Sequence, residues 1–407
     1  MPKSFFLKSS NIISVMAGLC LSIIYTNYPF PGQNFSISFI VFFIYLIIFG
    51  YLIISTQSFP RPCEPLLIIF IPYALFLSYV VYFSIGLENL STSRSQYLFS
   101  LPMIPLISFC IFNLSEFNKD YFLKSFYAII LLGTLLTIID SINDIRAEGI
   151  TTNSNTTAIA ALLGILILFY YISKQNNKRL ILLLSILCII HIYAIFLTGS
   201  RTGLIGFLIT FSFLFFNPYI SKKIVLSLFV ISLVLLPNTI AFERLLSLYD
   251  VIGQKVSDYI GVEENYFDKH KLGRKNVINR SESDKTTYEL FLENPSTGIG
   301  HGKVKKNISV KDQQLRLSHN SYILMLAEYG MVGFFLFLLF IGSIAYVFFT
   351  KKYISNSFKF NIIIPFFIIL IATSFFFHGF RHKMFWVLLS FATIEFSRSP
   401  QCMRGYS

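Results

Sequence analysis

The sequence has little charge. Only 13% of its 407 residues are Asp, Glu, Lys or Arg, whereas soluble domains carry about 25%. Hydrophobic residues make up 55% of the chain and include 46 Phe. This composition excludes an ordinary soluble domain and predicts an integral membrane protein. The formal net charge of +13 is the excess that such proteins collect on one side of the bilayer, and no nucleic-acid partner is expected.

Cysteine is also scarce. The five cysteines include no CxxC pair, and Cys20, Cys110 and Cys188 lie inside apolar runs. Neither a disulfide framework nor a zinc site is therefore predicted. Lys3 and Lys8 precede the first apolar run as in a signal sequence, but no clear small-residue cleavage site follows. An uncleaved first helix is expected instead.

Long apolar runs are abundant. Runs that can cross a hydrocarbon core of about 30 Å occur about twelve times, which predicts an all-α polytopic membrane protein. Helices are expected near residues 11–29, 36–55, 64–86, 97–114, 121–141, 155–173, 179–197, 202–217, 222–238, 329–349, 359–377 and 383–397. The chain then divides into nine membrane helices (1–238), one large, partly helical loop (239–328), and three membrane helices with the C-terminus (329–407).

The positions of Lys and Arg predict the orientation. With the N-terminus inside, fifteen of the 33 basic residues fall in inside segments and five in short outside loops. The other 13 lie in the long loop, which does not count toward orientation. Both termini are therefore expected in the cytoplasm, and the long loop on the outer side of the membrane.

The long loop contains a predicted helix and a glycine-rich turn. Residues 280–295 (RSESDKTTYELFLENP) have a helical pattern that Pro295 ends, and STGIGHG follows at 296–302. A glycine-rich turn alone is a weak signal, and neither GKS nor GKT follows it. The earlier part of the loop, around Glu263 and Lys271, is expected to be solvated surface.

The loop ends in a segment that contains a histidine, SHNSYILMLAEYGMVG. It predicts an interfacial helix that begins near His319 and Asn320, with Ser318 as its N-cap, and turns at Gly330 into the tenth span. A lone histidine is usually structural. At the start of a helix just outside the bilayer, however, it could act as general base toward a lipid-anchored substrate.

Few basic residues face outward, and Arg201 is one of them. It lies in a turn (LTGSRTGLIGF) where Gly199 and Gly203 allow close backbone approach. An arginine at a membrane edge can simply anchor a helix. It can also bind phosphate bidentately, beside the N–H groups at the start of the next helix. A second outward cluster, FFFHGFRHKMFW, contains Arg381.

In this order, these motifs resemble the O-antigen ligase and polymerase superfamily. The motifs are Ser200–Arg201, Arg280, Glu293-Asn294-Pro295 through Gly298 and Gly300, and His319–Asn320 followed by Glu328, Gly330 and Gly333. The resemblance implies a bacterial glycosyltransferase without metal or cofactor, in which His319 is catalytic and Arg201 and Arg280 bind pyrophosphate. Supporting roles are expected for Ser200, Asn320, Glu328, Gly298, Gly300, His301 and Arg381. The family often has Trp after Arg280, whereas this chain has Tyr288.

The resemblance further implies a donor glycan linked to undecaprenyl pyrophosphate. The favoured function is an O-antigen ligase, with lipid A–core as acceptor, in the bacterial inner membrane with its active site facing the periplasm. A polymerase of O-antigen or another surface polysaccharide, with a second lipid-linked repeat as acceptor, is the close alternative. A transporter of lipid-linked glycans is a remote one, because few charges lie inside the spans. Membrane lipids and a chain-length regulator are further partners to consider.

Overall fold

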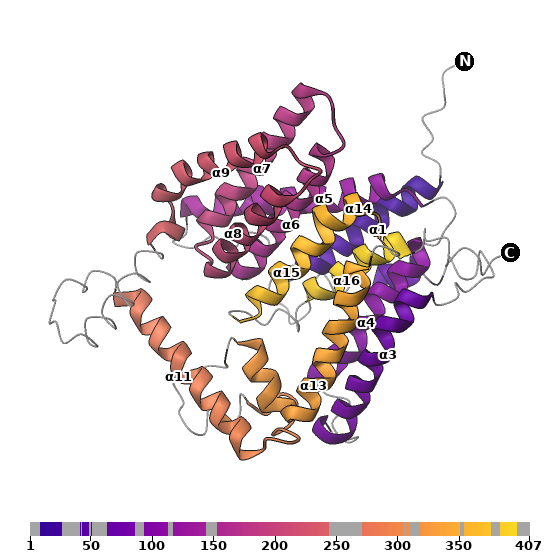
Figure 1. Ribbon diagram of the computed structural model, residues 1–407, viewed down its shortest axis with the longest axis vertical. Helices are drawn as coiled ribbons and strands as arrows, with labels where there is room; N and C mark the ends of the chain where they lie inside the picture. Colours follow the sequence, from indigo (N-terminus) through magenta and orange to yellow (C-terminus); the bar gives the residue numbers. More distant parts are fainter. Residues whose placement is uncertain are drawn as a thin grey trace.

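The computed structural model describes residues 9–26, 41, 43–48, 50, 63–85, 93–112, 117–143, 153–243, 271–304, 307–308, 318, 320–350, 354–375 and 383–396. Within these ranges all regular secondary structure is helical (Figure 1), which confirms the all-α class. The first helices are α1 (Ser9–Thr26), α3 (Glu64–Tyr79), η1 (Val80–Ile85), α4 (Ser93–Phe112), α5 (Lys119–Asn143) and α6 (Ser154–Ile172). Next come α7 (Lys178–Leu197), α8 (Arg201–Phe216), α9 (Lys222–Leu235), η3 (Leu236–Asn238) and α11 (Lys271–Glu293). The last are α13 (Ser321–Phe349), α14 (Asn356–Phe358), η5 (Lys359–Ile363), α15 (Ile364–Thr373) and α16 (Lys383–Phe396).

The described helices make this a multi-pass membrane protein. Six of them are long and apolar enough to cross a membrane, and four further apolar helices have 10–17 residues. The predicted number of twelve spans is therefore not confirmed. Of the predicted span at 36–55, only residues 41, 43–48 and 50 are described.

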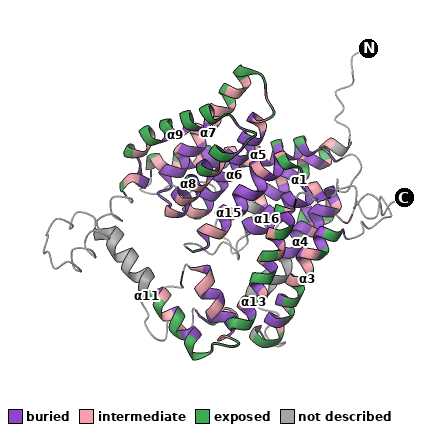
Figure 2. Ribbon diagram, in the orientation of Figure 1, coloured by how far each residue is buried: buried purple, intermediate pink, exposed green. Residues whose placement is uncertain are grey.

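Helix α6 lies at the centre of the bundle. All of its residues are buried except Asn155 and Tyr171, as expected of a helix that is apolar all round. It packs against α5, α7, α8 and α15, and Figure 2 shows α6, α15 and α16 mostly in the colour of buried residues. Glycine allows a close approach between α6 and α8. A Cβ added to Gly203 of α8 would lie 2.6 Å from the Cβ of Ala158 in α6.

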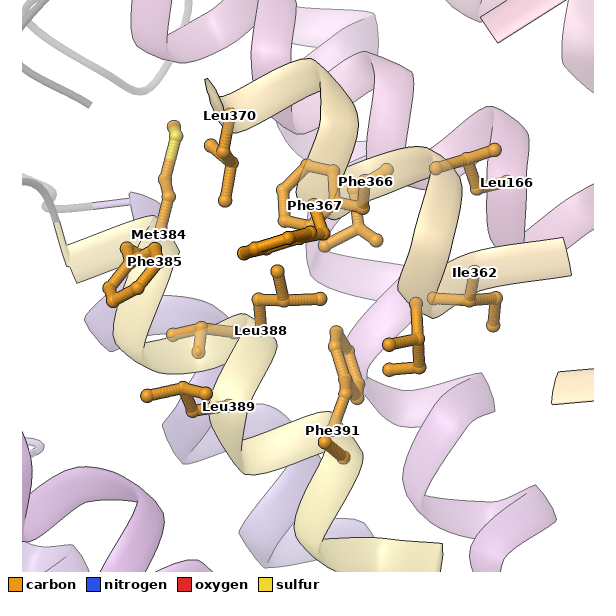
Figure 3. Close-up of a cluster of buried hydrophobic side chains, with 14 of the residues drawn as sticks. Leu166, Ile362, Phe366, Phe367, Leu370, Met384, Phe385, Leu388, Leu389 and Phe391 are labelled. Carbon is orange, nitrogen blue, oxygen red and sulfur yellow. The ribbon is translucent and has the colours of Figure 1, made fainter. Parts of the chain in front are cut away.

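Large apolar side chains fill the space between α6, α15 and α16. Figure 3 shows Phe367 and Leu370 of α15 beside Leu388 of α16, with Leu166 of α6 farther along α15. These side chains belong to one continuous core. Lipid tails are as apolar as leucine, so close packing contributes more to stability here than removal of side chains from water.

Helices α8 and α15 run antiparallel, which gives the bundle two recognisable ends. Beyond the end of α8, the side-chain amide of Asn217 donates to Oδ1 of Asn361, near the start of α15, at 2.8 Å. Farther along, Gly206 lies against Ile369, whose Cγ2 would be 3.3 Å from an added Cβ. We call the end where α8 begins the Arg201 end, and the opposite one the Lys119 end.

Paired charges close the Lys119 end. The ammonium group of Lys119 donates to the carboxylate of Glu395 and lies 3.6 Å from the centre of the Phe358 ring. The other oxygen of Glu395 accepts from the backbone N–H of Ser355 at 3.0 Å. Lys359 is 1% exposed and donates to the carbonyls of Phe349, the last residue of α13, and Thr350, its C-cap, at 3.3 Å each. Such partners reduce the cost of burying a charge.

A second, smaller hydrophobic cluster lies apart from the main core. It joins the last turns of α11 to the first part of α13 and includes Leu290, Phe291, Val304, Ile308, Leu324 and Ala327. The helix predicted for 280–295 is thus present, but it runs from Lys271 to Glu293. The sequence pattern missed its first turns because they are polar and have no apolar periodicity. Part of the long loop therefore packs against α13.

Candidate functional site

The start of α8 is hydrogen-bonded to α6. The hydroxyl of Ser200 accepts from the N–H of Gly203 at 3.0 Å and donates to Oδ1 of Asn155 at 2.6 Å. Ser200 is fully buried, and Gly199 before it has a φ of 55°, which suits glycine. Arg201 therefore begins its helix from a fixed backbone, and the positive end of the helix dipole adds to its charge.

Helix α11 is tied to the segment that precedes α13. The hydroxyl of Ser318 donates to a carboxylate oxygen of Asp284. In α11, Asp284 comes one turn after position 280, and residues four apart share a helix face. The backbone at Arg280 is described as helix, whereas its side chain lies outside the described residues. The bond joins the helix of Arg280 to the immediate neighbour of His319.

Asn320, rather than Ser318, caps α13. Its Oδ1 accepts from the N–H groups of Tyr322 at 3.0 Å and Ile323 at 3.3 Å. The predicted cap, Ser318, bonds Asp284 and accepts from the N–H of Asn320 at 3.1 Å. Both residues favour N-caps, so the sequence pattern alone could not separate them.

The beginning of α13 is also bound to the end of α15. The N–H of Ser321 donates to the carbonyl of Ser374 at 2.9 Å, and the hydroxyl of Tyr322 donates to the carbonyl of Ile371 at 2.9 Å. Gly206 of α8 lies against Ile369 of α15, and the two helices are antiparallel. Arg201 lies five residues before Gly206 and Ser374 lies five residues after Ile369, so both are about 7.5 Å from this contact in the same direction. Arg201 therefore lies at the level where α15 holds α13.

Helix α13 is broken at Gly330, as the sequence predicted. Gly330 has φ 63° and ψ −171°, and Figure 1 shows the two parts of α13 running in different directions. The break removes the usual hydrogen-bond partners of the preceding carbonyls. Two of these, on Ala327 and Glu328, accept instead from the N–H groups of Ile299 and Gly300, at 2.9 and 3.0 Å.

The same glycine turn, residues 295–302, also accepts hydrogen bonds from the residues that follow the break. The N–H of Met331 donates to the carbonyl of Pro295 at 2.8 Å, and that of Val332 to the carbonyl of Ser296 at 3.3 Å. The turn thus takes the place of the missing helical hydrogen bonds in both directions. We call this arrangement the α13 splice.

Two glycines make the α13 splice possible. Gly298 and Gly330 both have φ near +70°, the left-handed region that favours glycine. A Cβ added to Gly330 would lie 2.3 Å from the carbonyl oxygen of Ser296, and one added to Gly298 would lie 2.5 Å from that of Glu328. Both contacts are with backbone and leave no room for a side chain.

Polar side chains reinforce the α13 splice. Nδ1 of His301 forms a short hydrogen bond with the Tyr329 hydroxyl and lies 3.5 Å from a carboxylate oxygen of Glu328, which is 1% exposed. The His301 and Tyr329 rings stack at 5.8 Å and 13°. From α3, the Tyr79 hydroxyl donates to the Tyr329 carbonyl at 2.9 Å. In the part of the chain described, no group of three His, Cys, Asp or Glu residues could hold a metal ion.

The structure brings several predicted residues into contact. Gly298, Gly300, His301 and Glu328 form one assembly, and Ser200 and Asn320 each cap a helix. His319 and Arg381 lie outside the described residues, so their roles stay predictions. Sequence reasoning missed Asn155, Tyr79, Asp284 and Ser374. Of these, only Asp284 left a signal, because it stands one turn after Arg280.

The comparison with known families agrees with the motifs. Residues 186–338 match the family model described as O-antigen ligase. This match confirms the resemblance predicted from the sequence, and its range contains the start of α8, α11, the glycine turn and the broken part of α13. No curated protein matches the chain.

Proposed function

We propose, from the assignment of residues 186–338 to the O-antigen ligase family, that this membrane protein is an O-antigen ligase. It transfers a polysaccharide from undecaprenyl pyrophosphate to a sugar hydroxyl of lipid A–core. The reaction takes place at the periplasmic face of the bacterial inner membrane. Transfer of the ligase or polymerase type is the general activity of the family, and the acceptor is the specific part of the proposal.

The distribution of lysines supports the proposed orientation. Lys119, Lys174, Lys178 and Lys222 stand where α5, α7 and α9 begin and α6 has just ended. These points belong to the Lys119 end, which would face the cytoplasm under the positive-inside rule. The Arg201 end, with the glycine turn and α11, would then face the periplasm.

The proposed chemistry is a single displacement. The acceptor hydroxyl attacks the anomeric carbon, His319 accepts its proton, and the bond from that carbon to the pyrophosphate oxygen breaks. Undecaprenyl pyrophosphate leaves, and the anomeric configuration inverts. Arg201 and Arg280 stabilise the negative charge that develops on the leaving group, so no strong general acid is required.

One observation carries the proposal: three distant segments converge at the Arg201 end. The Ser318–Asp284 bond joins the neighbour of His319 to the helix of Arg280. The Ser321–Ser374 bond joins the same segment to α15, which packs against the helix of Arg201. Each of the three proposed residues therefore belongs to a segment within this one connected network.

Lipopolysaccharide profiles test the proposal directly. Cells that lack the protein would be complemented with the wild type or with His319→Ala, at matched expression. A ligase predicts bare core with accumulation of lipid-linked polymer in the null strain and with His319→Ala. Normal ladders with His319→Ala would overturn the catalytic assignment.

A polymerase of surface polysaccharide is the second candidate, because the sequence motifs resemble a superfamily that contains both ligases and polymerases. It predicts a core that carries a single repeat unit in the null strain. A transporter predicts neither pattern, but a loss of lipid-linked glycan from the outer side of the membrane. The same gels, with analysis of the lipid-linked pool, therefore separate all three.

A further inference from the structure

An apolar groove lies between α8 and α9, which form an antiparallel hairpin. It has a volume of about 300 Å³ and is lined by Leu208, Phe211, Ser212, Phe215, Phe216, Val225, Leu226 and Phe229. Only Ser212 among these is polar. The groove is therefore suited to a hydrocarbon chain.

The groove lies on the same face of α8 as Arg201. Leu208 and Phe215 follow Arg201 by seven and fourteen residues, close to two and four turns of helix. The other lining residues of α8 continue this stripe. At 1.5 Å per residue, the groove begins about 10 Å from Arg201 and reaches Phe216 about 22 Å from it. Arg201 and the groove are thus aligned along one helix face.

A second cation marks the far end of the groove. The ammonium group of Lys222 lies 5.7 Å from the centre of the Phe215 ring. Lysines near the ends of membrane helices bury their apolar stems and place the charged group at the membrane surface. The groove therefore runs across the apolar layer, from beneath Arg201 toward the Lys119 end.

We propose that this groove binds the isoprenoid chain of the lipid pyrophosphate donor while Arg201 binds the pyrophosphate. The inference rests on the proposed function and deepens it. A lipid with an anionic head and one long, branched apolar chain matches both the charge of Arg201 and the aromatic lining of the groove. An acyl chain of a bilayer phospholipid is the competing occupant.

Occupation of the groove affects binding rather than chemistry. The chain makes the same contacts before and during the transfer, so the groove contributes equally to the ground and transition states. Filling it should raise KM for the donor and leave kcat unchanged. A donor that lacks the long chain should not respond at all.

Photo-crosslinking tests the occupant without any need for transfer. The full-length protein would be placed in vesicles of phosphatidylethanolamine and phosphatidylglycerol with a glycan-free polyprenyl pyrophosphate that carries a diazirine on its chain. Crosslinks are expected on the groove residues of α8 and α9, and unlabelled polyprenyl pyrophosphate should compete with the probe. The proposal would be overturned if a diazirine phospholipid labelled the groove equally well and unlabelled polyprenyl pyrophosphate did not reduce the labelling.

Two matched variants test the effect on transfer. Leu226→Trp fills the groove, whereas Leu183→Trp changes a leucine of α7 outside it; both leucines are 53% exposed. Leu226→Trp is expected to raise KM for the long-chain donor about tenfold, which corresponds to about 1.4 kcal/mol, and to leave kcat unchanged. Leu183→Trp should change neither, and a short-chain donor should show no difference between the variants.

The outcomes distinguish the two proposals. Groove labelling that the lipid pyrophosphate competes away, without transfer by any variant, would support the groove and refute the proposed function. Transfer with an unchanged KM in Leu226→Trp, and labelling elsewhere, would refute the groove and leave the function standing. Because labelling uses the wild-type protein, it tests the groove even if a variant fails to fold.

Discussion

The two ends of the helix bundle use polar groups in different ways. At the Lys119 end, buried side chains pair with one another and with helix termini, as in the pair of Lys119 with Glu395. At the Arg201 end, backbone groups of irregular segments bond one another in the α13 splice, beside side-chain bonds such as Ser318 to Asp284. The first arrangement closes the bundle, whereas the second shapes a site. Mutations at the two ends should therefore separate stability from activity.

The largest effect is expected on stability at the Lys119 end. Lys119→Ala leaves the carboxylate of Glu395 buried without its cation, which typically costs about 3–5 kcal/mol. Thermal unfolding in detergent should show the loss, while transfer per folded molecule stays at the wild-type level. Lys124→Ala, at an exposed lysine of the same helix, is the control. A large drop in specific activity without a loss of stability would show that the Lys119 end does contribute to the site.

At the Arg201 end, Gly330→Ala should act mainly on activity. The left-handed φ and the 2.3 Å approach to the Ser296 carbonyl force the α13 splice to move. Strain of this kind costs about 1–3 kcal/mol, so transfer should fall by up to about 100-fold. Gly342→Ala lies in the same helix with open space around it and should be silent. Equal activities of the two variants would show that the splice does not position the site.

Glu328→Gln probes the buried carboxylate beside His301. It keeps the shape of the side chain but removes the buried charge that lies 3.5 Å from Nδ1 of His301, in surroundings of low dielectric that strengthen electrostatic interactions. A fall in kcat of about tenfold is expected in a transfer assay. Glu289→Gln, at an exposed site in α11, should not change kcat. A change confined to KM would place Glu328 in donor binding instead.

The smallest effect is expected for the Ser318–Asp284 bond. Asp284→Ala and Ser318→Ala should each reduce transfer several-fold, because either releases the neighbour of His319 from α11. The double variant should be little worse than the singles, with a coupling energy of about 0.5–3 kcal/mol. Glu282→Ala, two residues away and exposed, is the control. Strictly additive effects would mean that the bond does not connect the two segments.

The membrane helices were the more predictable part of the fold. Apolar length alone located helices such as α6 and α7, because a span needs little else. It did not determine how many helices are long enough to cross, since α8 and α9 have only 16 and 14 residues. It also missed the start of α11, whose polar turns carry no periodic apolar pattern.

The sequence predicted many residues of the candidate site, but not how they contact one another. The glycine turn and the turn at Gly330 were both visible in the sequence. Their docking was not, because bonds such as Ile299 to Ala327 join backbone groups and leave no side-chain pattern. Asp284 differs, because its helical spacing from Arg280 is visible in the sequence. Only its hydrogen bond with Ser318 in the structure shows why that spacing matters.

The α13 splice has a consequence for how this region tolerates sequence drift. Its four backbone bonds are made by groups that nearly every residue type supplies, so Ile299, Ala327, Met331 and Val332 can change identity without loss of a bond. The splice therefore depends on backbone conformation, and the residues that determine it are the glycines with positive φ, Gly298, Gly300 and Gly330. A saturation scan of the bonding positions should show Gly298, Gly300 and Gly330 as intolerant of substitution, and Ile299, Met331 and Val332 as permissive.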